Sequence, residues 1–335
     1  MVAHTQAMVD QWKPGQVLDV HHAMVDVSLS IAGLTMFGAK LVGDEAQRFG
    51  KSSDEAVGYY RYAVLPGSSI LLHTPVPWVH RFKKARKHID DTVYGIIRAR
   101  RDGTDTGRGD LLTLMRDARD SEGDGGGMSD VQVRDEAVTM LVAGHETVAS
   151  SMAWTFMLLS QNPDIVAAVR EEVEMVAPNR GLTADDVGQL KLLRRVCMES
   201  LRLYPLGYAT VREASVDTEI GGFRVSTGTE VSVPIMLVHR DERWWPNPEK
   251  FDPDRWLEGA DSERPKHAYI PFGSGRRVCV GQGFAMMEMV LVLATVLRSW
   301  APHVEHPEQV EIEAFFTMRP KGGLPVELRT PPLTG

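Results

Sequence analysis

One long stretch of helical sequence limits the folds that this chain can adopt. A helix is expected to begin near Ser129 or Asp130, which are both favourable capping residues, and to run to about Gln161, where Asn162 and Pro163 stop it. At 1.5 Å per residue such a helix spans roughly 45 Å, which is enough to cross a whole domain. An element of this length favours a mainly helical architecture.

Shorter segments predict a helical first part and a strand-containing last part. Apolar residues at helical spacing predict further helices at 19–37, closed by Gly38, and at 79–101, 164–176, 193–203 and 283–300. Beyond Pro205 short strand-like stretches follow at 210–214 and 219–234, and a hairpin is expected over 310–328 with Gly322-Gly323 near its turn. The predicted fold class is mainly α with small β-sheets. It forms a single domain over 1–335, with a helical part at 1–205 and a β-rich part at 206–335.

Composition and charge exclude several classes of protein. Hydrophobic residues make up 43% of the 335 residues and charged residues 24%, as in a chain that forms a core and is not disordered. The formal net charge of -8 argues against a general nucleic-acid-binding protein. Two cysteines are too few for a disulfide framework, and the N-terminus lacks the basic flank and apolar stretch of a signal peptide. The longest apolar run, Met289–Leu297, is well short of the roughly 18 residues of a spanning helix, so a cytoplasmic protein is expected.

A glycine-rich loop around one cysteine carries the strongest chemical signal. The loop reads Pro271-Phe-Gly-Ser-Gly-Arg-Arg-Val-Cys-Val-Gly281, and an apolar helix is expected directly after it. Glycines let a flat ligand approach the backbone, while a helix start and two neighbouring arginines stabilise a thiolate. Such a thiolate could be a nucleophile or a metal ligand, or the cysteine could be buried and inert. Zinc would require further Cys and His residues at close spacing, which the sequence lacks, whereas an axial thiolate on heme iron requires only one cysteine.

The loop resembles the heme-binding signature of the cytochrome P450 family. It contains the pattern Phe-x-x-Gly-x-Arg-x-Cys-x-Gly, with every defining position present from Phe272 to Gly281. The resemblance implies that Cys279 is the proximal ligand of the iron in heme b (iron protoporphyrin IX). It also implies that Phe272 packs against the ligating side of the heme and that Arg277 binds a propionate. Gly273 and Gly281 are expected to belong to the same cofactor-binding loop.

A charged pair upstream of the loop fits the same family. Glu199 and Arg202 are three residues apart on a predicted helix, so their side chains share a face and can pair. Arg255 lies in a Pro/Trp-rich coil between this helix and the cysteine loop. The three residues resemble the structural Glu–Arg–Arg triad of the family. The resemblance implies that they lock the coil that leads to the heme loop.

The sequence Ala143-Gly-His-Glu-Thr147 falls in the middle of the long helix. Small residues on one face leave room beside the helix, and the Thr147 hydroxyl can bond a backbone carbonyl and locally widen the helix. The stretch resembles the oxygen-activation motif of the family, which implies that Thr147 supports dioxygen and that Glu146 helps to deliver protons. The family often has a second Thr or Ser where this chain has Val148. His145 is interpreted as a packing or surface residue and not as a catalytic base.

Two further basic features have expected roles. Arg212 lies in a predicted strand where the family often places a second propionate-binding arginine. A basic cluster flanks the cysteine loop in an otherwise acidic chain, and it is either an ordinary solvated surface or a docking patch for an acidic electron donor. Its members are Arg264, Lys266, His267, Arg276 and Arg277, of which Arg276 is the better docking candidate because Arg277 is expected to face the heme.

The resemblance implies a heme-thiolate monooxygenase. Such an enzyme inserts one oxygen atom from O2 into an organic substrate, here expected to be small and apolar, and it takes electrons from a separate donor of the ferredoxin or flavin reductase type. A peroxide-driven peroxygenase is the rival enzyme, although Glu146 and Thr147 argue against it. The family normally has about a hundred further residues before the point where this chain starts. A non-catalytic or weakly heme-binding fragment is therefore the alternative, and the resemblance leaves room for a membrane anchor in a preceding segment.

Overall fold

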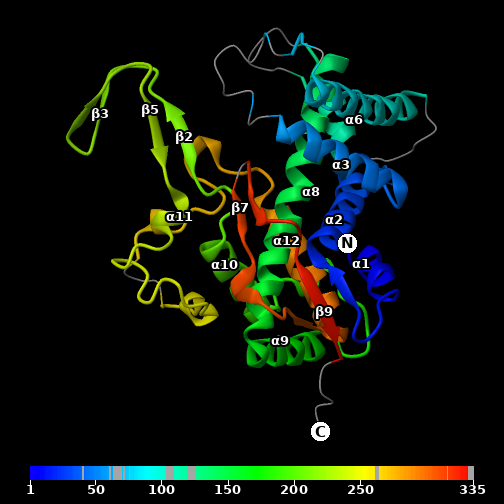
Figure 1. Cartoon of the computed structure of the whole chain (residues 1–335), viewed down its shortest axis with the longest axis vertical. Helices are drawn as coiled ribbons and strands as arrows, with labels where there is room; N and C mark the ends of the chain where they lie inside the picture. The colour runs from blue at the N-terminus through cyan, green and yellow to red at the C-terminus, as the bar shows by residue number, and fades with distance from the viewer. Residues whose placement is uncertain are drawn as a thin grey trace. The chain divides into compact units, whose positions relative to one another are not determined.

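The chain is mainly helical with small β-sheets, as the sequence predicts (Figure 1). The computed structural model describes residues 1–39, 41–59, 62, 70, 72–74, 76–102, 109–119, 126–260, 264–314 and 316–330. Its helices are α1 (Val2–Val9), α2 (Val20–Phe37), α3 (Asp44–Gly58), α6 (Pro77–Arg101), α7 (Leu111–Asp117), α8 (Asp130–Ser160), α9 (Pro163–Val176), α10 (Lys191–Leu203), α11 (Ile235–Val238) and α12 (Gln282–Ser299). Its strands are β1 (Val17–Asp19), β2 (Thr210–Glu213), β3 (Thr218–Ile220), β4 (Phe223–Val225), β5 (Glu230–Val233), β6 (Ala301–His303), β7 (Ile312–Ala314), β8 (Met318–Pro320) and β9 (Pro325–Arg329).

Two compact units share the long helix α8. The first comprises Met1, Ala3–Trp12 and Asp19–Ala149, and the second comprises Val2, Lys13–Leu18 and Ser150–Gly335. The parts at 1–205 and 206–335 that the sequence suggests are a different division of the chain, and they stay a prediction.

Capping residues set the ends of the helices in the first unit. Asp19 accepts a hydrogen bond from the backbone N–H of His22 at the start of α2, and Gly38 ends this helix in a left-handed conformation with φ of 63°. At the start of α8, Ser129 and Gln132 bond each other's backbone N–H groups, which is the reciprocal arrangement of a capping box. Helices α2 and α8 therefore begin where the sequence predicts.

An apolar core holds the first unit together. α3 packs on both α2 and α6 (Figure 1). α7 packs on α2. The core draws on all of these helices and on the first half of α8, with Phe37, Phe49, Ile89, Leu112 and Leu141 among its members. Burial of such side chains is the main favourable contribution to the free energy of folding.

Helices α9, α10 and α12 pack against one another in the second unit. The last turns of α8 add Trp154, which stacks on Tyr204 with 4.3 Å between ring centroids and donates its indole N–H to the carbonyl of Met318. Thr155 and Ser200 join α8 to α10 through a buried bond between their hydroxyl groups, 2.8 Å long. Both helices thus have a fixed position within this unit, which places Glu199 and Arg202 in its interior.

The small sheets correct one expectation. β7 pairs with β8, but β9 does not continue that hairpin and instead lies between β1 and β6 in a three-stranded sheet. Gly322 and Gly323, both with positive φ, redirect the chain from one sheet to the other. The predicted hairpin over 310–328 with its turn at these glycines is therefore wrong, because the partners of β9 are distant in sequence. β2 pairs with β5, and β3 pairs with β4.

Two helices in the described parts of the chain, α2 and α12, are long and apolar enough to cross a membrane by length and composition alone. Half of α2 and 61% of α12 are buried inside the protein. Core helices of soluble proteins pass the same test, so these two helices do not show a membrane anchor.

Candidate active site

The cysteine loop is a series of tight turns that ends at the start of α12. Gly273 and Gly275 adopt positive φ values of 73° and 69°, which residues with a Cβ rarely adopt. The N–H of Cys279 donates to the carbonyl of Phe272 at 2.9 Å, so the loop closes on itself. Gly281 is the N-cap of α12, and the cysteine therefore lies two residues before a helix N-terminus, as predicted.

The thiol of Cys279 is free and exposed, which suits a ligand to an external metal centre. Cys197, by contrast, is fully buried in α10, and burial raises the pKa of its thiol to about 12. Gly281 leaves space beside the exposed sulfur, because a Cβ at this position would lie 3.8 Å from Sγ. In the part of the chain that the structure describes, no three His, Cys, Asp or Glu side chains group to hold a metal ion. A single protein donor fits heme, because the porphyrin nitrogens would also ligate the iron.

The structure brings the three residues of the predicted triad together. Arg202 is completely buried and donates two hydrogen bonds to the Glu199 carboxylate, at 2.8 and 2.9 Å. Nε of Arg255 lies 3.3 Å from Oε1 of the same carboxylate. Glu199 also accepts from the indole N–H of Trp256 and from the backbone N–H of Asp252. The carboxylate therefore joins α10 to the coil around Trp256.

Arg202 also bonds the coil directly. Its two terminal nitrogens donate to the carbonyls of His239, Pro248 and Lys250, at 2.7 to 3.2 Å. Its guanidinium lies 5.0 Å from the ring centroid of Trp245. One buried cation thus satisfies three backbone carbonyls that have no helix or sheet partner of their own.

The predicted oxygen-activation residues lie in the half of α8 that belongs to the first unit. Thr147 donates its hydroxyl hydrogen to the carbonyl of Ala143 at 2.7 Å, which confirms the predicted bond, and α8 is α-helical at this position. Glu146 is largely buried and lies 3.9 Å from Nε2 of His21. His145 is buried, donates to the carbonyl of Leu141 and meets the Phe49 ring edge-on, so it is a packing residue.

The basic residues near the loop divide into two groups. Lys266, His267, Arg276 and Arg277 are exposed, whereas Arg264 lies over the ring of Trp245, 3.9 Å from its centroid. Arg264 is therefore a packing residue and not part of an exposed patch. Arg212 is exposed on β2 and donates to the hydroxyl of Thr210.

Sequence reasoning gave no role to His239. This residue follows α11, is completely buried, and bonds both the Arg202 backbone and the segment that enters the cysteine loop. Its partners lie 37 and 31 residues away, so no local pattern could have indicated them.

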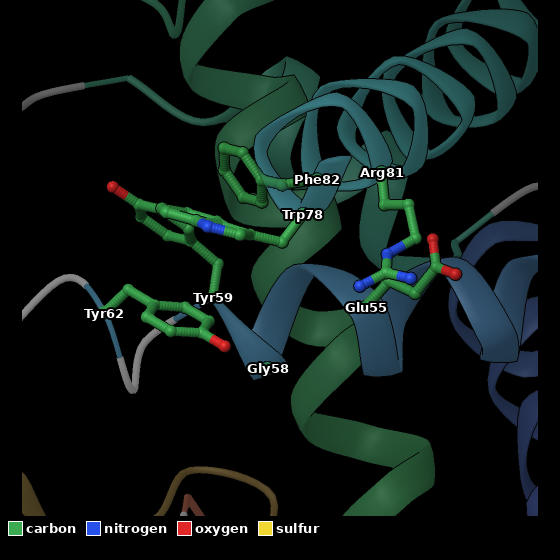
Figure 2. A pocket seen from close by; sticks show the side chains of 7 residues that line it. All are labelled: Glu55, Gly58, Tyr59, Tyr62, Trp78, Arg81 and Phe82. Carbon is green, nitrogen blue, oxygen red and sulfur yellow. The ribbon is translucent and has the colours of Figure 1, made fainter. Parts of the chain in front are cut away.

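A hollow of about 310 Å³ in the first unit is lined by aromatic rings. Figure 2 shows two tyrosines from the end of α3 and beyond it turned toward Trp78 and Phe82 of α6, with Glu55 and Arg81 pointing toward each other at one side. Tyr59 stacks on Phe82 at 4.3 Å, and Tyr62 stacks on Trp78 at 4.4 Å. Because the rings stack on one another, they hold the end of α3 against α6. None of the residues predicted to form the active site lies in this hollow.

Three comparisons with known proteins indicate one family. The family model described as "Cytochrome P450" matches residues 1–325. The chain is 34% identical over 328 residues to "Putative cytochrome P450 132" of Mycobacterium tuberculosis, covering 93% of this chain and 69% of that protein. It is 33% identical over 320 residues to "Pentalenene oxygenase" of Streptomyces avermitilis, covering 95% and 70% respectively. The crystal structure of the cytochrome P450DA heme domain superimposes with a TM-score of 0.87 at 29% identity, over 98% of this chain and 72% of that one.

The family match and the mainly helical fold shared with a heme domain define a heme-thiolate protein. The chain belongs to the cytochrome P450 family. It is accordingly a monooxygenase with heme as its cofactor, an organic substrate, and electrons from a redox partner.

Proposed function

We propose that Cys279 supplies the axial thiolate to heme b in this monooxygenase and that Glu146 and Thr147 deliver protons during turnover. The observation that carries the proposal is the free, exposed thiol at the start of α12, in a chain whose other cysteine is buried. When bound, the heme supplies the chemistry that activates dioxygen and transfers one of its oxygen atoms to the substrate. The remaining steps depend on side chains of this chain.

The cysteine loop is proposed to hold the cofactor through several contacts. Arg277 and Arg212 would each bind a propionate, since both guanidinium groups are exposed and a carboxylate is their best partner. Phe272 would pack against the heme on the thiolate side. Gly273 and Gly281 would leave room for a flat ligand, because neither carries a side chain into the loop.

Proton delivery is proposed to begin at the Glu146 carboxylate. This group keeps some contact with solvent, with 16% of its side chain exposed, so it can take up protons from outside and release them inward. The Thr147 hydroxyl donates to the Ala143 carbonyl at 2.7 Å, and a hydroxyl group can accept hydrogen bonds as well as donate one. Val148 takes no part in this transfer.

The finer identity of the partners is also proposed. An electron donor of the ferredoxin or flavin reductase type with an acidic docking face would fit the exposed Lys266, His267 and Arg276. A small, apolar organic substrate is supported by the similarity to a protein named pentalenene oxygenase. A cytoplasmic location is supported by the two relatives reported above, since both come from bacteria.

The proposal is tested by heme content and by turnover. The purified chain is reconstituted with heme, and the bound heme is counted per chain. Product formation is then compared between O2 with a reductase system and peroxide alone. One heme per chain with turnover driven by O2 and reductant supports the proposal. A chain that binds no heme contradicts it, and turnover with peroxide alone identifies a peroxygenase.

A further inference from the structure

His239 occupies a buried position between the triad and the cysteine loop. It follows α11 directly, has no exposed surface, and stacks on the ring of Tyr269 with 5.3 Å between centroids. Its carbonyl accepts a hydrogen bond from the Arg202 guanidinium at 2.9 Å. The residue is therefore bonded to the triad through its backbone, and its ring is free to bond elsewhere.

The two ring nitrogens bond two different backbone segments. Nδ1 lies 3.2 Å from the carbonyl of Arg202, and Nε2 lies 2.8 Å from the backbone nitrogen of Ile270. A carbonyl can only accept and an amide N–H can only donate, so the proton is on Nδ1 and Nε2 accepts. Only a neutral ring makes both bonds. Burial lowers the pKa of this imidazole to about 4, and the nearby cations of Arg202 and Arg240 act in the same direction.

From Ile270 a short series of backbone bonds leads to the cysteine. The carbonyl of Ile270 accepts from the N–H of Gly273, which closes the first turn of the loop. The carbonyl of Phe272 accepts from the N–H of Cys279. The position of Ile270 therefore sets where the loop begins, and the loop in turn sets where the thiol lies.

The two residues before Ile270 are also bonded to buried groups. The indole N–H of Trp245 donates to the carbonyl of Ala268, and the Tyr269 hydroxyl donates to the carbonyl of Met198. Ile270 is the last residue of this bonded segment, and His239 is the side chain that bonds it. Both nitrogens of the buried ring therefore have backbone partners, one on each of two separate segments.

We propose that His239 is a positioning residue that transmits the fixed geometry of the triad to the cysteine loop by holding the backbone N–H of Ile270. This inference rests on the proposed role of Cys279 as the heme ligand. Loss of the Nε2 acceptor releases the start of the loop, and the thiolate then ligates the heme in only part of the molecules.

Two substitutions separate the ring's contacts. An Asn side chain reaches the position of Nδ1, so His239→Asn keeps a donor for the Arg202 carbonyl and loses the acceptor for Ile270. A Gln side chain reaches the position of Nε2, so His239→Gln retains that acceptor. Hydrogen exchange of the Ile270 amide is measured on the full chain, together with the spectrum of the reduced, carbon-monoxide-bound form.

The wild type is expected to protect the Ile270 amide, and His239→Gln is expected to keep that protection. In His239→Asn the exchange should quicken about fivefold to tenfold, as the loss of one ordinary hydrogen bond implies. Part of the His239→Asn protein should also lack the thiolate band, while His239→Gln retains it.

Equal Ile270 exchange in all three proteins overturns the inference, as does faster exchange spread evenly over the whole chain in both variants. An unprotected Ile270 amide in the wild type overturns it without any variant. If His239→Asn does not fold, loss of Ile270 protection in His239→Gln overturns it, and retained protection supports it. A wild type without a thiolate band refutes the role of Cys279 instead, and the exchange measurement, which needs no heme, still tests the link between His239 and Ile270.

Discussion

Replacing Arg202 with leucine should destabilise the second unit far more than removing a surface ion pair does. The substitution removes all five hydrogen bonds that the guanidinium donates, two to Glu199 and three to the carbonyls of His239, Pro248 and Lys250. Both partners of the ion pair are completely buried. Removal of one partner from a buried pair typically costs about 3–5 kcal/mol, because the remaining charge is desolvated and uncompensated.

The residual contacts of Glu199 keep this cost within that range. Arg255 still lies 3.3 Å from the carboxylate, and Trp256 and the backbone of Asp252 still donate to it. The carbonyls of His239, Pro248 and Lys250, which lose their hydrogen-bond donor, have no such replacement. Since domains are typically stable by only about 5–15 kcal/mol, the expected loss is a large share of the whole.

A matched control lies on the same helix. Arg195 pairs with Asp254 at 2.6 Å, but the Asp254 side chain is 70% exposed, so Arg195→Leu should cost less than about 1 kcal/mol. Urea unfolding of the wild type and both variants, followed by circular dichroism and tryptophan fluorescence, gives the comparison. The reasoning is refuted if Arg202→Leu loses no more free energy of unfolding than Arg195→Leu.

Three further predictions concern other parts of the chain. Thr147→Ala should uncouple reductant consumption from product formation and Glu146→Gln should slow turnover; unchanged coupling and turnover, measured as reductant, peroxide and product, would contradict the proton-delivery proposal. Gly33→Ala should lower the melting temperature, because its Cβ would lie 2.9 Å from the carbonyl oxygen of Ala39, whereas Gly50→Ala meets only ordinary contact at 3.5 Å and should be neutral or stabilising by up to about 1 kcal/mol; equal melting temperatures would refute this. Burial lowers the pKa of His239 in the folded chain to about 4 from an ordinary 6.5, so the unfolded chain takes up its proton first as the pH falls below 6.5. Between pH 7.5 and 5 the free energy of unfolding, measured with urea, should therefore fall by about 2 kcal/mol more in the wild type than in His239→Gln. Equal pH dependence of the two proteins would show that the ring is not buried and neutral.

The sequence predicted those parts of the fold that depend on local interactions. Asp19, Gly38 and Ser129 mark helix ends through bonds to residues a few positions away, and the structure places the ends there. The helix α3 was not predicted. Its buried residues Ala46, Phe49, Gly50 and Ser53 lie at helical spacing, but only Phe49 is a large apolar residue, and the helix is held by packing on α2 and α6.

Local sequence patterns could not predict the pairing of strands that are far apart in the chain. β9 lies beside β1, which is some 300 residues earlier in the chain, and no turn signal could reveal that partnership. Local patterns likewise revealed only part of the candidate site. The cysteine loop and the pair Glu199 and Arg202 are contiguous motifs, whereas His239 acts through backbone groups of residues far along the chain.

The central claim is that Cys279 is the thiolate ligand of the heme, and the reduced, carbon-monoxide-bound spectrum tests it most directly. The wild type, Cys279→Ser and Cys197→Ser are each reconstituted with heme and compared under the same conditions. The buried Cys197 is the matched control, since both variants exchange one sulfur atom for oxygen. The red-shifted thiolate band is expected in the wild type and in Cys197→Ser, and it should be absent from Cys279→Ser. A thiolate band that survives in Cys279→Ser, or one that disappears only in Cys197→Ser, would contradict the assignment.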